Sequence, residues 1–172
     1  MAFDPARTAA LLLEGGLSSG GVVKGVAIVE AASGHEPDAT HESGDEANTV
    51  DRGLWQINDV WHPEVTDEMA FDPVAATREA VRIKGSGDWT AWSVYKNGSW
   101  RAHRKLGWVA LRLAMCQASR DTWQQEFAIV TDEANELTVR RDDLSALLRV
   151  SEARVLTLDV ARLSAIQRLN NV

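Results

Sequence analysis

The sequence predicts a mainly α-helical protein, with a small N-terminal domain and a long helical extension at the C-terminal end. Asp-Pro pairs at 4–5 and 72–73 precede apolar residues with helical spacing, and Asp followed by Pro is typical of a helix start. Glycine and proline punctuate the chain up to Gly107, and neither occurs in 108–172. An apolar content of 45% and a charged content of 25% are typical of a globular chain.

The N-terminal part contains four stretches with helical signals. The first follows Asp4-Pro5 and ends at Gly15-Gly16, and the second begins after Gly20-Gly21 and ends near Ser33-Gly34. A third runs from Asp72-Pro73 to Gly85, and a short fourth one contains Trp89, Trp92 and Tyr95. Between the second and third, the acid-rich segment 35–52 predicts a surface loop, and 53–58 predicts a short extended segment or turn.

Helix is expected throughout the chain after Gly107, with Asp142-Asp143 as the cap of a last helix. The segment 155–160 is rich enough in β-branched residues to form a strand instead. Apolar positions fall on more than one face, so this region is expected to pack on another chain or on the main domain; a plain amphipathic helix is the alternative. The expected division is therefore a domain over 1–108 and an assembly extension over 109–172.

Composition excludes several classes of protein. A net charge of −7 argues against nucleic acid as the main partner. No apolar run approaches the roughly 20 residues needed to span a bilayer. The N-terminus lacks the pattern of a signal peptide, so the protein is expected to be made in a cytoplasm or to leave without one. The single Cys116 excludes an internal disulfide, and its apolar neighbours favour a buried thiol.

No metal or cofactor is expected. His35-Glu36 and His41 resemble a zinc-protease motif only superficially, because the motif needs two His four residues apart on one helix and Pro37 lies between these two. The Trp content points elsewhere. Six of the seven Trp lie between Trp55 and Trp108, and this enrichment favours either a carbohydrate cleft or an aromatic core.

Three segments, in this order, resemble motifs of the lysozyme-like superfamily. They are residues 27–34 (ending Ser33-Gly34), Gly53-Leu54-Trp55-Gln56-Ile57-Asn58, and residues 92–98 (containing Tyr95-Lys96-Asn97-Gly98). The chain is most similar to the branch of soluble lytic transglycosylases and goose-type lysozymes, in its phage or actinobacterial form. The resemblance covers about residues 8–108. It implies a lysozyme-like fold that cleaves the N-acetylmuramic acid–N-acetylglucosamine β-1,4 bond of peptidoglycan.

The resemblance also implies that a single Glu acts first as acid and then as base, and that the substrate's acetamido group can serve as nucleophile. A Glu donates a proton at neutral pH only when an apolar pocket raises its pKa. Glu30 is the candidate because it shares a helix face with Val23, Val26 and Ala27.

One position departs from the family pattern. The family Glu directly precedes Ser-Gly, whereas Ala32 stands there in this chain. Two residues along a helix correspond to about 200° of rotation. Either the helix end shifts register and Glu30 serves, or the site has lost its acid; a structural Glu30 would pair with Arg52 or Lys24.

The remaining candidates are four substrate-binding residues. Gln56 and Asn58 are expected to bind the sugar's acetamido or hydroxyl groups. Trp55 fits a cleft wall or the core equally well, and Tyr95 either positions substrate or is a core residue.

The sequence thus favours a muramidase or lytic transglycosylase that opens the cell wall as part of a phage virion or tail. Its partners would be peptidoglycan strands, and other virion proteins or a second copy through 109–172. The alternative is an inactive lysozyme-like module that is structural or docks on glycan in a virion, and Ala32 is the residue that supports it.

Overall fold

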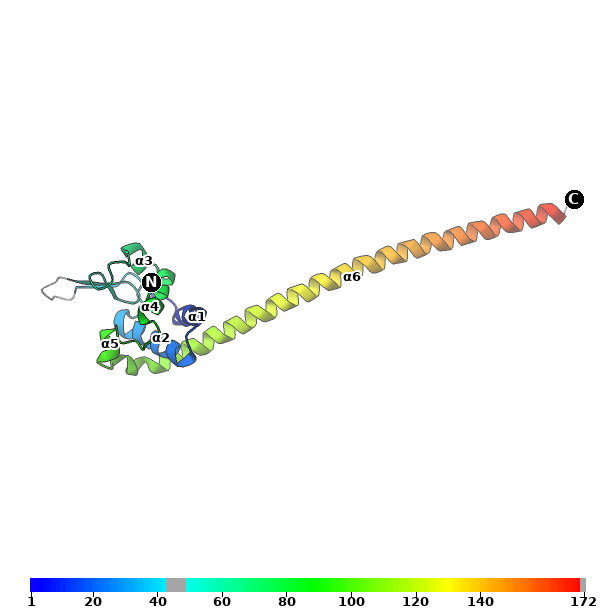
Figure 1. The fold of residues 1–172 in the computed structure, drawn as a ribbon. Helices are drawn as coiled ribbons and strands as arrows, with labels where there is room; N and C mark the ends of the chain where they lie inside the picture. The colour runs from blue at the N-terminus through cyan, green and yellow to red at the C-terminus, as the bar shows by residue number, and fades with distance from the viewer. Residues whose placement is uncertain (43–48, 171–172) are drawn as a thin grey trace. The chain divides into compact units, whose positions relative to one another are not determined.

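A computed structural model describes residues 1–42 and 49–170 of the chain. It divides into two compact units, Met1–Ser119 and Arg120–Val172. The elements of the first unit run from α1 to the early turns of α6, and α6 continues into the second unit (Figure 1).

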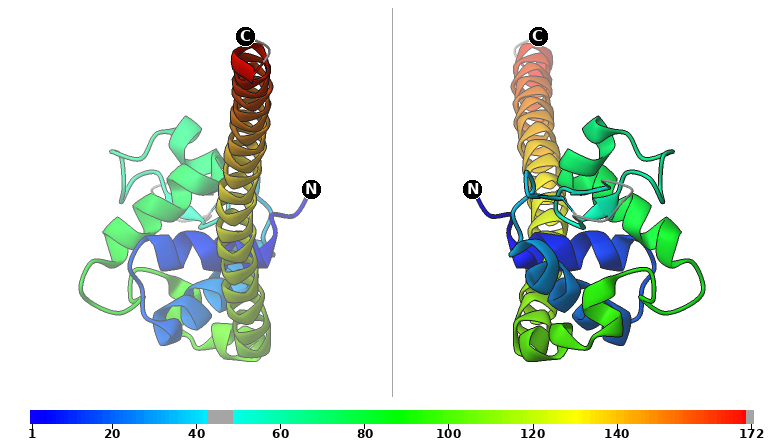
Figure 2. Two further views of the ribbon diagram at one scale, coloured as in Figure 1. Left: turned by 90° about the vertical axis from the view of Figure 1, so that its right-hand side faces the viewer. Right: turned by 90° about the vertical axis from the view of Figure 1, so that its left-hand side faces the viewer.

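The buried helix α2 (Ser19–Ser33) is the centre of the first unit. Its apolar residues between Val22 and Val29 are almost completely inaccessible to solvent. It contacts α1 (Pro5–Glu14), α5 (Ser93–Lys96) and the 3₁₀ helix η1 (Ser99–His103) (Figure 2). Because the middle of α2 is buried, it is mainly the residues near its two ends that can contact a ligand.

A three-stranded antiparallel sheet in the order β1-β2-β3 follows α2. Its strands are β1 (Thr40–Glu42), β2 (Val50–Arg52) and β3 (Ile57–Asn58). Part of the expected acidic loop therefore forms strands, and its residues 43–48 lie outside the described part of the chain. Buried Arg52 anchors the sheet, since its guanidinium donates to the Val65 carbonyl oxygen at 2.9 Å and to Asp67 at 2.7 Å.

Two further helices and a cluster of three tryptophans complete the first unit next to the sheet. Asp72 caps α4 (Pro73–Lys84) through the Ala75 N–H, as its Asp-Pro pair predicts, whereas α3 (Asp67–Phe71) has no counterpart among the expected helices. The indoles of Trp55 and Trp89 stack at 5.2 Å, and Trp92 packs edge-on against both.

The last helix, α6 (Arg104–Asn170), belongs to the first unit over its early turns. Ala110, Leu111 and Ala114 are buried in the core of that unit. The compact unit thus ends at Ser119, later than the expected boundary after Trp108.

The structure corrects two expectations for the C-terminal region and confirms a third. The helix passes Asp142-Asp143 without interruption, whereas 155–160 is helical, as expected, and does not form the alternative strand. Cys116 is exposed, not buried, because it lies on the side of α6 away from the buried Ala110 and Ala114. Within the described residues, none of the helices combines the length and apolar character needed to cross a membrane.

Gly53 provides a test of the close packing next to the sheet. Its φ is +69°, and a Cβ at this position would lie 1.8 Å from the Ala70 carbonyl oxygen. We expect Gly53→Ala to lower the free energy of unfolding by more than about 2 kcal/mol, measured by chemical denaturation. Gly16→Ala is the matched control, since Gly16 has φ +79° but open space around it, and should cost about 1 kcal/mol. Equal losses would contradict the clash.

Truncation tests the extent of the first unit. A chain of residues 1–119 should keep its circular dichroism spectrum and a cooperative thermal transition, because it retains all the residues of that compact unit. A chain ending at Trp108 should be molten or insoluble, because it loses Ala110, Leu111 and Ala114 from the core. Cooperative unfolding of the shorter chain would show that the early turns of α6 are dispensable.

Candidate functional site

A pocket of about 200 Å³ lies at the C-terminal end of α2. Its walls come from the sheet and the loops beside β3, from α4, and from α5 with the segment that precedes it. Its lining residues are Ala32, Asp51, Gln56, Ile57, Asn58, Trp61, His62, Ile83, Ala91, Trp92, Ser93 and Val94. Two of the expected site residues, Gln56 and Asn58, are therefore in one pocket, whereas Glu30, Trp55 and Tyr95 are not among its lining residues.

The end of α2 is fixed so that Ala32 lies at the pocket. Ser33 Oγ donates to the Leu54 carbonyl oxygen at 2.7 Å, which ties the last helical turn to the segment before Gln56. Gly34 then ends the helix in a left-handed conformation. The position that carries Glu in the family pattern thus reaches the pocket, but here it has only a methyl group.

Glu30 lies elsewhere, as expected from two residues of helical rotation relative to Ala32. Its Oε2 is 3.8 Å from Nε2 of His35, and its side chain is 32% exposed. It pairs with neither Arg52 nor Lys24, which bind Asp67 and Asp88 instead. No shift of the helix register brings Glu30 into the pocket.

His35 is the buried partner of Glu30. Only 1% of the residue is exposed, and its Nδ1 is 3.4 Å from the Thr8 hydroxyl. Burial lowers the pKa of His35 below its usual value of 6.5, and the charges of Glu30 and Asp4 oppose this effect only in part. The imidazole is therefore neutral at neutral pH.

Gln56 presents an acceptor to the pocket. Its side-chain nitrogen donates to the carbonyl oxygens of Ala39 at 3.0 Å and Gly53 at 2.9 Å, so both amide protons are used. These bonds hold the residue in a left-handed backbone conformation with φ +50°. The amide oxygen of Gln56 remains as the group that can accept an N–H or O–H from a ligand.

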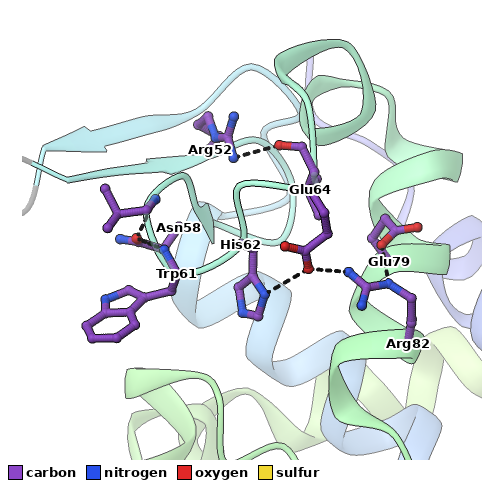
Figure 3. Close-up of polar contacts among 9 residues, drawn as sticks. Arg52, Asn58, Trp61, His62, Glu64, Glu79 and Arg82 are labelled. Carbon is purple, nitrogen blue, oxygen red and sulfur yellow. Dashed lines mark hydrogen bonds and ion pairs between the residues drawn. The ribbon is translucent and has the colours of Figure 1, made fainter.

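Asn58 holds two other lining residues of the pocket in place. Its side-chain nitrogen donates to Asp51 at 2.8 Å. Its oxygen accepts the backbone N–H groups of Val60 and Trp61, both at 3.1 Å; Figure 3 shows Asn58 beside Trp61. Asn58 therefore positions Asp51 and Trp61. Asp51 is the one carboxylate among the described residues that line the pocket.

The tryptophans divide between the core and the pocket. Trp55 is completely buried, and its indole N–H donates to the Thr77 hydroxyl at 2.9 Å, so it is a core residue and not a cleft wall. Trp61, in contrast, is 76% exposed where it lines the pocket. Sequence reasoning missed Trp61; its place three residues after the Gly53–Asn58 motif was the available signal.

A chain of polar contacts positions His62, another lining residue that the sequence reasoning did not assign. His62 Nδ1 lies 3.4 Å from Glu64, which accepts from Arg82 at 2.6 Å, and Arg82 also binds Glu79 at 2.6 Å (Figure 3). The hydrogen bond from Arg82 is the largest cause that lowers the pKa of Glu64, to about 2. Glu64 thus stays ionised and holds the imidazole at the pocket.

Tyr95 lies outside the pocket in a separate polar cluster. Its hydroxyl donates to Asp88, which also accepts from Lys24 at 2.7 Å, and its ring stacks on Trp100. The hydrogen bond to Asp88 raises the pKa of Tyr95, and the one from Lys24 lowers the pKa of Asp88 to about 2. Tyr95 therefore fastens α5 to α2 rather than contacting a ligand in the pocket.

Taken together, the pocket has an aromatic face, an amide acceptor, a carboxylate and an imidazole. Among residues 1–42 and 49–170, no three His, Cys, Asp or Glu side chains are arranged to hold a metal ion. This set of groups is suited to a polar ligand with apolar faces, such as a sugar ring.

Comparison with protein families identifies the fold. A family model described as a lysozyme-like domain matches residues 9–94. The chain belongs to this family. Comparison with curated proteins returns no match. At the level of the family, the match supports action on peptidoglycan as a glycosidase or transglycosylase, and it confirms the mainly helical lysozyme-like fold.

The neutral state of His35 predicts how stability depends on pH. The pKa of His35 in the folded state lies below its value in the unfolded state. The contribution of neutral His35 to the free energy of unfolding is therefore complete above about pH 6.5, and it is lost progressively as the pH falls toward the folded-state pKa. His35→Asn, which keeps a residue that tolerates positive φ, should flatten the decrease in melting temperature below pH 6.5. Exposed His41→Asn is the control and should leave that decrease unchanged; a response of both variants would refute the assignment.

Proposed function

We propose that the pocket of this lysozyme-like domain binds peptidoglycan glycan strands, and that the chain docks on glycan rather than cleaving it. The observation that carries the proposal is Ala32, which lines the pocket at the position where the family pattern has its acid. Binding groups surround that position, and no Glu is among the described residues that line the pocket.

The chemistry of the pocket matches an N-acetylated sugar. The free amide oxygen of Gln56 can accept the N–H of an acetamido group. The exposed face of Trp61 can stack on the apolar face of a sugar ring, and His62, held by Glu64, can hydrogen-bond a hydroxyl.

Cleavage would need a proton donor for the leaving oxygen, whereas docking would not. Glu30 lies outside the pocket beside His35, with a third of its side chain exposed. Asp51 is inside the pocket, and together with the family match it supports glycosidic cleavage as the second candidate function. As a muramidase or lytic transglycosylase, the protein would use Asp51 rather than Glu30.

The setting that we propose is the one that the sequence favours, a component of a phage virion or tail. A domain that binds the cell wall, joined to a helix with an exposed apolar surface, is suited to a role at the point where a particle meets the wall. Other virion proteins, or a second copy of the chain, would then be partners of the helix.

Binding and cleavage can be measured on purified peptidoglycan in one set of proteins. The unmodified chain should co-sediment with the glycan and release no soluble muropeptides. Trp61→Ala should weaken binding by about tenfold or more, because an exposed aromatic contact at the centre of a site costs over 1 kcal/mol when truncated. Trp108→Ala, which removes an exposed Trp outside the pocket, is the control and should bind normally.

Carboxylate variants identify any acid. Glu30→Gln should change nothing, whereas Ala32→Glu should introduce muropeptide release, since a general acid contributes about 10²–10⁴-fold to rate. Muropeptide release by the unmodified chain would refute the proposal that the chain only docks. If Asp51→Asn or Glu30→Gln abolished that release, the substituted residue would be the acid. Failure to bind glycan at all would overturn the proposal.

A further inference from the structure

Large apolar side chains lie exposed along the part of α6 that forms the second unit. Six of them belong to a pattern of eight positions whose spacing alternates between four and three residues. Ala134 and Arg141 occupy the other two positions of this pattern. We call positions 123, 127, 130, 134, 137, 141, 144 and 148 the heptad stripe. The exposed fractions of its large apolar members are Trp123 72%, Phe127 74%, Val130 61%, Leu137 64%, Leu144 66% and Leu148 60%.

This spacing is typical of a helix that packs against another helix. A repeat of seven residues matches 3.5 residues per turn and drifts about 20° per heptad around a straight helix, so it stays in contact only with a partner that winds around it. Helices gain most of their stability from packing an apolar face. In the described part of the second unit, which is helix α6 alone, no other element covers the stripe.

We infer that the heptad stripe is covered by the stripe of a second copy of this chain, with the two helices antiparallel. The observations that favour a second copy are the self-complementarity of the stripe and of the charges beside it. This inference concerns the second unit and is independent of the proposed glycan site.

The antiparallel register places large residues against smaller ones and charges against opposite charges. With Ala134 opposite Leu137 of the second copy, Trp123 meets Leu148 and Phe127 meets Leu144. The flanking Glu133 then lies across from Arg140 of the second copy, and two-fold symmetry repeats this pair.

A parallel pair has no such complementarity. Arg141 would face Arg141 of the second copy inside the seam, where like charges repel strongly because water is largely excluded. Glu133 and Arg140 would face the uncharged Thr138 and Ser145. In the antiparallel pair Arg141 lies beside Val130 and its long side chain can extend from a two-stranded seam into water, which also disfavours three or more strands.

The oligomeric state of the full chain tests the inference. Sedimentation equilibrium over a dilution series should give twice the chain mass of 18.9 kDa at high concentration. Leu137→Glu, which puts a charge in the seam, should weaken association by at least about 100-fold. Val139→Glu is the matched control: Val139 is 60% exposed on the same helix but outside the heptad stripe, so this variant should associate like the unmodified chain.

Each other result contradicts the inference. A monomer at every concentration, or three times the chain mass, would overturn the second copy as the occupant. Equal weakening by both substitutions would show that the stripe is not the interface. Circular dichroism of both variants distinguishes lost association from a lost helix, and a helix that melts equally in both would also count against the stripe.

Cysteine cross-linking tests the direction of the helices. In a Cys116→Ser background, Ala134→Cys and Leu137→Cys chains are mixed and oxidised. Disulfides need Cα atoms about 4.4–6.8 Å apart, so the antiparallel pair should give mainly the mixed product. Mainly Ala134→Cys or Leu137→Cys homodimers would overturn the antiparallel arrangement.

Discussion

The hydrogen bond from Ser33 Oγ to the Leu54 carbonyl oxygen decides which residues form the pocket. It joins the last turn of a buried helix to the loop that contains Gln56, so the helix end cannot rotate without breaking that contact. Because α2 is packed among α1, α5 and η1, its phase is fixed along its whole length. Ala32 therefore reaches the pocket and Glu30 does not, and the chemistry available to the domain follows from that phase.

The elements that sequence predicted well are those with strong local signals. Asp4 and Asp72 cap α1 and α4 by accepting backbone N–H groups, and Gly34 ends α2 in a left-handed turn. Helix α3 was missed because its five residues are too few to show an apolar periodicity. Gln56 and Asn58, which a single motif predicts to bind the sugar, both line the pocket, where Asn58 positions its neighbours.

Sequence could not place the residues whose position depends on tertiary contacts. Trp55 and Trp61 have the same side chain and lie six residues apart, yet stacking on Trp89 buries one and the turn held by Asn58 exposes the other. Glu30 looked functional because its neighbours on the helix are buried. Its partner is instead His35. The left-handed turn at Gly34 places His35 beside Glu30, and the spacing of residues in the sequence does not reveal such a contact.

Helix α6 carries different kinds of side chain in the two units. Over its early turns α6 contributes small buried residues, Ala110 and Ala114, to a core that needs a tight fit. Beyond Ser119 it carries large residues at heptad spacing, which fit another helix rather than a globular core. A glycan strand repeats the same sugars along its length, so binding two pockets at once would raise the retention of a dimer on the wall without any tighter single contact. Docking benefits from such pairing more than cleavage does, because an enzyme must release its product, whereas a docking module only has to stay bound.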